Sequence, residues 1–138
     1  MAFLTKSDIQ KAIKADMLAA LLDSDDTVVT AAIDEAVAKV QNYLSGRYDM
    51  KIELAKTGTN RHQLLVVYTG DIAIYNIWRY VDPMQIPARR VAAYDEAMEW
   101  LKAAMAGEAS TTLTPESDGE TSGGTLYFNS NDKRINQY

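Results

Sequence analysis

The sequence predicts a mainly α-helical fold: a small bundle of three to four helices with a long inter-helix loop and an extended C-terminal arm. Apolar residues recur at helical three- and four-residue spacing in three stretches, residues 27–46, 61–81 and 88–106. After Gly107 the composition changes to Ser, Thr, Gly and acidic residues. We therefore expect a helical domain at 1–107, a linker at 108–124 and a docking arm at 125–138.

A short helix is expected near the N-terminus. Thr5 and Asp8 form the T-x-x-D pattern of a helix start, and Ile9 and Ile13 follow at four-residue spacing. Another apolar cluster comes next along the chain, at Met17, Leu18, Leu21 and Leu22. The acidic run 23–26 then suits the start of the following helix, because the helix dipole favours negative charge there.

Two long helices are expected on either side of a connection. The first spans residues 27–46, and the second spans 61–81 with Gly70 inside it, which indicates close approach of a neighbouring backbone. Residues 47–60 are predicted to form the long connection, because their end, 56–60, is rich in turn residues. The prolines at 83 and 87 then end the second long helix.

The last helix is predicted at residues 88–106 and ends at Gly107, which suits a left-handed stop. Its buried stripe is expected to consist of Val91, Tyr94, Met98, Leu101 and Met105. The aromatic residues on helical stripes are predicted to pack in the core: Tyr75, Trp78, Tyr94 and Trp100.

Composition excludes several classes of site. The chain has 138 residues, 47% of them hydrophobic, which is typical of one globular domain. It has no cysteine and one histidine, so disulfides, thiolate zinc sites and two-histidine metal sites are excluded. We expect no metal, no cofactor, no catalysis, no signal peptide and no membrane span. The formal net charge of −5 argues against tight binding to nucleic acid, which needs basic residues to neutralise phosphates.

Three segments in order carry a resemblance to a known family. They are Tyr43-Leu-Ser-Gly-Arg-Tyr48, Asp71-Ile-Ala-Ile-Tyr-Asn-Ile-Trp-Arg79 and Arg90-Val-Ala-Ala-Tyr-Asp-Glu-Ala-Met-Glu-Trp-Leu-Lys-Ala-Ala-Met-Ala-Gly107. With the helix order, they resemble the Mu-like phage neck family of head–tail connector, or head-completion, proteins. The resemblance covers residues 5–107, with a weaker echo at 128–134. In that family, prolines often follow the Arg-Tyr pair. This chain departs from the pattern, because Asp-Met-Lys follows Tyr48.

The resemblance implies a structural protein without chemistry. Such proteins form a homo-oligomeric ring, typically of twelve copies, beneath the portal protein. The ring extends the DNA channel without specific DNA binding and contacts the next neck or tail-completion protein. The protein would be made in the cytoplasm of the bacterial host and act in the virion, in the neck between head and tail. An acidic channel wall would repel phosphates, which is compatible with the net charge.

Candidate interface residues follow from side-chain type. Arg47 and Tyr48 either anchor a neighbouring subunit, because both types are enriched at interfaces, or serve local pairing and core packing. Arg89 and Arg90, like Lys133 and Arg134, are basic doublets suited to intersubunit ion pairs or, less readily, to DNA phosphates. The arm offers apolar anchors at Leu126, Tyr127, Phe128 and Ile135 for a neighbour's groove or sheet edge.

Two other functions stay open. A small helical adaptor or DNA-binding regulator of a mobile element would need a basic recognition helix. The best candidate, residues 88–106, balances its basic side chains against acidic ones. An enzyme would have to rely on carboxylate, Lys, Tyr or Ser groups, or on His62 as a lone base. We favour a polar, helix-capping role for His62, because no motif places a nucleophile beside it.

Overall fold

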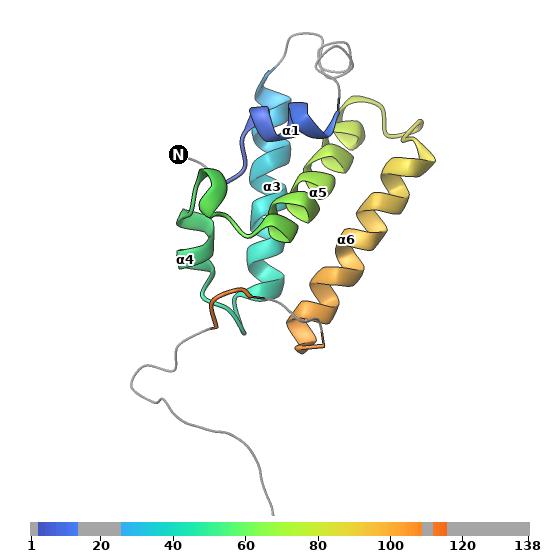
Figure 1. The fold of residues 1–138 in the computed structure, drawn as a ribbon. Coiled ribbons are helices and arrows are strands. Elements are labelled where there is room, and N and C mark those ends of the chain that lie inside the picture. The colour runs from blue at the N-terminus through green and yellow to red at the C-terminus, as the bar shows by residue number, and fades with distance from the viewer. Residues whose placement is uncertain (1–2, 14–25, 109–111, 116–138) are drawn as a thin grey trace, which may run out of the picture.

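The fold is mainly helical, as the sequence predicts (Figure 1). The computed structural model describes residues 3–13, 26–108 and 112–115. These contain five α-helices, α1 (Lys6–Ala12), α3 (Asp26–Leu44), α4 (Met50–Ala55), α5 (Gln63–Val81) and α6 (Ala88–Ala106), and a 3-10 turn, η1 (Gly58–Asn60). The described helices thus exceed the three or four expected by one, because the short helix α4 lies inside the predicted connection.

The three long helices run in alternating directions, with α5 between α3 and α6 (Figure 1). Helix α5 is therefore surrounded and buries residues around much of its circumference, including Leu65, Ile72 and Ile77. Its buried Asn76 is satisfied, since its amide donates to the Ala32 carbonyl of α3 at 3.2 Å. The hydrophobic side chains alone predicted this helix, whereas the polar link to α3 came only from the structure.

Helix α1 begins as predicted. Thr5 and Asp8 form a reciprocal capping box in which each side chain accepts the other residue's backbone N–H. Ile9 is fully buried and Ile13 is partly buried against the core. The predicted apolar cluster at residues 17–22 lies outside the described residues.

Helix α6 has the predicted bounds but not the predicted buried stripe. Leu101 is buried, whereas Val91 and Met105 are 36% and 46% exposed. The buried line instead consists of Ala97, Leu101 and Ala104, as alanines let the helix backbone approach its neighbours. Tyr94 and Met98 lie half-buried at the edge of this line. Helical spacing does not distinguish large from small apolar residues, and it predicted a stripe of large ones. The close packing of α6 against its neighbours instead buries the small alanines.

The four aromatic residues expected in the core lie at its margin. All of them are partly buried, and the Tyr75 and Tyr94 rings stack across α5 and α6 with centroids 4.1 Å apart. Lys39 of α3 donates to the Tyr94 hydroxyl at 2.8 Å, so the three long helices meet at this pair. The aromatic residues therefore seal the core against solvent.

The connection at residues 47–60 is more structured than expected. It holds α4 and η1, and the Asp49 side chain caps α4 by accepting the Ile52 N–H at 3.3 Å. Helix α4 has six residues, too few for a periodic signal, and it buries Glu53 beside Met50. Hydrophobic patterning assigns glutamate to the surface, so it could not indicate that Glu53 is buried in a helix. For this reason α4 was not predicted.

Replacing Gly70 by alanine should stabilise the protein. The expected approach of a neighbouring backbone is wrong, because a Cβ at Gly70 meets no atom within 4 Å. Alanine is better than glycine inside a helix, so the free energy of unfolding should rise by about 0.5–1 kcal/mol in urea titration. Gly107→Ala is the opposite control. Gly107 has φ +80°, and an added Cβ would lie 2.9 Å from the Arg47 guanidinium carbon. Gly107→Ala should therefore lower the free energy of unfolding by about 1 kcal/mol. Equal effects of the two changes would contradict both assignments.

Candidate interaction surfaces

Arg47 and Tyr48 lie at the C-terminal end of α6. The Arg47 Nε donates to the Met105 carbonyl at 3.1 Å, and the Tyr48 hydroxyl donates to the Ala104 carbonyl at 3.1 Å. The last carbonyls of a helix lack partners within it and carry its negative dipole end, so both contacts are favourable. Tyr48 is buried and therefore packs within its own chain, whereas Arg47 stays exposed. Of the two roles open for this pair, the structure shows the local one for Tyr48.

Residues 112–115 lie against the helical domain. Leu113 is 3% exposed, the Asp49 N–H donates to the Thr114 carbonyl at 2.8 Å, and Tyr48 and Pro115 form an isolated antiparallel bridge. These residues fall inside the segment 108–124, which composition indicated to be a solvated linker. One apolar residue, Leu113, is enough to bring the chain back onto the domain, and composition averaged over the segment conceals it.

The carboxylate of Glu53 holds this returning segment. Its Oε2 accepts from the Thr114 N–H at 2.9 Å, from the Thr114 hydroxyl at 2.6 Å and from Lys56 at 3.2 Å. Burial alone would raise the pKa of Glu53, but these bonds lower it below its usual range. Glu53 is therefore a buried, charged structural residue that sequence analysis missed.

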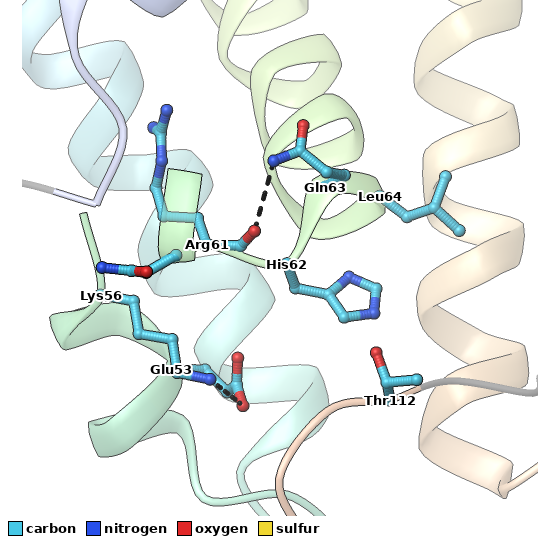
Figure 2. Close-up of a pocket in the computed structure, with 8 residues that line it drawn as sticks. Glu53, Lys56, Arg61, His62, Gln63, Leu64 and Thr112 are labelled. Carbon is cyan, nitrogen blue, oxygen red and sulfur yellow. Dashed lines mark hydrogen bonds and ion pairs between the residues drawn. The ribbon is translucent and has the colours of Figure 1, made fainter. Parts of the chain in front are cut away.

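An open hollow of about 550 Å³ lies beside Glu53 (Figure 2). Its lining includes Lys56, His62, Gln63, Leu64 and Thr112. His62 caps α5, because its Nδ1 accepts the Leu65 N–H at 3.3 Å, as the capping interpretation expected. Burial lowers the pKa of His62 and favours the neutral ring that this bond requires. Glu53 is likewise occupied by its own partners, so these two groups serve the fold.

Arg89 and Arg90 lie in the first turn of α6. Arg89 is exposed, whereas Arg90 is half-buried and faces the charge of Asp71 on α5. Burial raises the pKa of Asp71, Glu96 raises it further, and Arg90 opposes them. Glu96 also accepts a hydrogen bond from Tyr68 at 3.2 Å, so acidic side chains accompany the arginines on this part of the surface.

The remaining predicted interface residues belong to the arm. Leu126, Tyr127, Phe128, Lys133, Arg134 and Ile135 lie outside the described residues. The described surface also exposes large apolar side chains, which no sequence pattern marked. These are Ile52, Leu64, Val67, Tyr80, Val81, Met84, Val91 and Met105.

Across residues 3–13, 26–108 and 112–115, His, Asp and Glu side chains form no group of three that could hold a metal ion. None of the helices described in the structure is long and apolar enough to cross a membrane.

The chain matches one protein family over nearly its whole length. The family is described as bacteriophage Mu, Gp36, and its model matches residues 3–128. The match includes the helices, the returning segment 112–115 and Leu126–Phe128, and so extends beyond the helical part that carried the resemblance. No curated protein matches the chain. Because the family model covers well over half of the sequence, the chain belongs to the bacteriophage Mu Gp36 family.

Proposed function

We propose that the chain is a structural subunit of the phage neck, a head–tail connector (head-completion) protein. In this role it forms a ring under the portal, extends the DNA channel and joins the head to the next neck or tail component. The observation that carries the proposal is membership of a phage family over residues 3–128. The proposed role needs neither catalysis nor a cofactor, and its site is the virion neck.

Surface composition supports assembly. The described residues expose several large apolar side chains, among them Leu64, Val67 and Met84, and such residues in number mark sites of protein association. Helices with apolar residues on their outer faces can pack side by side between subunits, as a ring of about twelve copies requires.

Charge supports a channel that does not hold DNA. The described ranges contain eleven Lys and Arg against twelve Asp and Glu, so the helical domain is nearly neutral. A nearly neutral wall offers no excess of cations to release counterions from DNA, which is the main source of non-specific affinity. Most of the excess acidic residues lie elsewhere in the sequence, at 16–25 and 116–132. The described residues therefore support a channel wall of balanced charge rather than the acidic wall that the net charge of the whole chain suggests.

Assembly can be tested directly by light scattering and negative-stain imaging of the chain with and without its portal protein. We expect closed rings, or a subunit bound to the portal in the mixture. A chain ending at Pro115 is the matched variant, because it keeps Leu113 and Thr114 in place and removes only residues 116–138. Loss of rings in that variant would assign assembly to the C-terminal segment.

A monomer that never joins the portal would overturn the connector proposal. A gel-shift assay at two salt concentrations then tests the DNA-binding alternative, which requires strong, salt-dependent binding. Helix α6 carries three basic side chains, at positions 89, 90 and 102, and three acidic ones, at positions 95, 96 and 99. A major-groove helix with this balance would bind DNA weakly.

A further inference from the structure

Arg47 lies across the C-terminal end of α6 with only part of its guanidinium in use. Its Nε donates to the Met105 carbonyl at 3.1 Å. A Cβ added to Gly107 would lie 2.9 Å from Cζ of Arg47 and 3.0 Å from each Nη, so the flat face of the guanidinium covers this glycine. The group is therefore held in place although the residue is exposed. A guanidinium has five N–H donors, and the four on the Nη atoms remain after the bond to Met105.

No carboxylate in the part of the chain that the structure describes pairs with these Nη groups. Within that part, Arg47 forms no salt bridge at or below 4.0 Å. The nearby carboxylates in sequence are those of Asp49, Glu53 and Glu108. Asp49 caps α4, and Glu53 holds the returning segment. Glu108 follows Gly107 directly, yet its carboxylate does not come within 4.0 Å of the guanidinium.

The bridge between Tyr48 and Pro115 determines which residues lie opposite one another here. Proline has no N–H, so the hydrogen bonds of this antiparallel pair belong to the flanking residues. One of them is the bond from the Asp49 N–H to the Thr114 carbonyl at 2.8 Å. Residues 49 and 114 therefore lie on one side of the bridge, and the register continues on its other side with residues 47 and 116.

Continued by one residue, this register sets Glu116 opposite Arg47. Residues opposite one another in an antiparallel pair have Cα atoms about 5.5 Å apart and side chains on the same face. We propose that the Nη edge of Arg47 is a carboxylate-binding site, and that its ligand is Glu116 of the same chain. One guanidinium then binds the end of α6 through Nε and the first residue of the C-terminal segment through charge-assisted bonds of about 2.8 Å.

Chain connectivity selects this carboxylate over one from a neighbouring subunit. Glu116 follows Pro115 directly, so its Cα lies about 3.8 Å from that of a residue already bridged to Tyr48. A group tethered so closely has an effective concentration on the order of millimolar or higher, and a neighbour's carboxylate would have to displace it.

The site extends beyond the connector role, because it requires neither a ring nor a portal. It fixes the point at which residues 117–138 leave the bundle, beside Tyr48 and the start of α4 (Figure 1). Within the proposed ring, each C-terminal arm would start from this fixed point on its own subunit.

Amide hydrogen exchange of Asp49 in the full-length chain measures the attachment, because the Asp49 N–H is bonded to the returning segment. Glu116→Gln removes the charge and keeps the size of the side chain, so the exchange rate should rise about threefold, as for loss of an exposed ion pair. Arg47→Gln should raise it by a similar factor, and the double variant should add nothing further, since both changes remove the same pair. Glu120→Gln, in the same segment, is the matched control and should leave the rate unchanged.

Carbodiimide cross-linking identifies the partner of position 47. Full-length Arg47→Lys protein is prepared with and without ¹⁵N, mixed in equal amounts and cross-linked, and the peptides are identified by mass spectrometry. We expect a link between position 47 and Glu116 in which both peptides carry the same isotope. Lys102 is an exposed lysine on α6 and should link to Glu116 several-fold less often.

Four results would overturn the site. These are an unchanged Asp49 exchange rate in Glu116→Gln, effects of the two single changes that multiply in the double variant, links of position 47 to Glu108 in place of Glu116, and links between peptides of different isotope, which would assign the carboxylate to a neighbouring subunit. Each result is obtained whether or not the chain forms rings, so failure of the site and failure of the connector proposal are separate observations.

Discussion

Replacing Arg61 by alanine should lower the free energy of unfolding by about 3–4 kcal/mol, because it breaks a largely buried ion pair and leaves a carboxylate behind. Arg61 forms two bonds with the Asp8 carboxylate, Nη1 to Oδ2 at 2.8 Å and Nη2 to Oδ1 at 3.1 Å. Nη1 also donates to the Phe3 carbonyl at 2.7 Å, and Nε donates to the Gly58 carbonyl at 2.8 Å. The side chains of Arg61 and Asp8 are only 12% and 9% exposed, so solvent screens the pair little. One guanidinium thus fastens the N-terminal segment and η1 to the start of α5.

The effect should depend on pH in a defined direction. The hydrogen bonds from Arg61, the largest cause, hold the pKa of Asp8 at about 2, against 3.8 for a free aspartate. A depressed acid pKa stabilises the fold fully above pH 3.8, and this contribution disappears as the pH falls towards 2. The shift corresponds to about 2 kcal/mol of the loss expected for Arg61→Ala.

Urea titration at several pH values measures both quantities. Near neutral pH the difference between wild type and Arg61→Ala should be full, and below pH 3.8 it should shrink. Arg89→Ala removes an exposed arginine and should change stability by less than about 0.5 kcal/mol. A loss of unfolding free energy below about 1 kcal/mol at neutral pH would contradict the stabilising role of the Arg61–Asp8 ion pair. A difference between the two proteins that grows on acidification would contradict it as well.

Local signals in the sequence account well for the elements that the structure confirms. Thr5 and Asp8 are three residues apart, and Pro87 and Gly107 flank a 19-residue helix, so short-range chemistry determines α1 and α6. The polar contacts that join the elements were not predictable in this way. Arg61 lies 53 residues from Asp8, and Glu53 lies 61 residues from Thr114. No periodicity relates such positions, because their proximity exists only after the helices have packed.

The candidate interface shows the same division. Residue type singled out Arg47 and Tyr48 but could not distinguish contact with a neighbouring subunit from contact with the end of their own α6, which the structure shows. The exposure of Met84 was equally unpredictable, because residue type is the same whether a methionine is buried or exposed. The structure gives the exposed fraction of each side chain, and this fraction distinguishes the residues of the surface from those of the core.

Replacing Glu53 by alanine should cost about 2–3 kcal/mol, because the Thr114 N–H loses its acceptor and a buried cavity replaces the carboxylate. Glu53→Gln keeps an acceptor oxygen and should cost about half as much. Glu99→Ala, at an exposed position on α6, is the control and should be nearly neutral. Because the bonds hold the pKa of Glu53 below 4.5, this contribution should be present above pH 4.5 and fade below it.

A double-mutant cycle of Glu53→Ala with Thr114→Val, followed by urea unfolding, separates two accounts of the domain's end. If Glu53 stabilises α4 alone, the two effects add, and the carboxylate does not hold residues 112–115. If the carboxylate fastens the returning segment, the effects overlap by about 1 kcal/mol or more, because either change breaks the same bonds. We expect the overlap. Residues 112–115 would then be part of the folded domain, and in the sequence the first acidic residue of the C-terminal segment, Glu116, follows them directly.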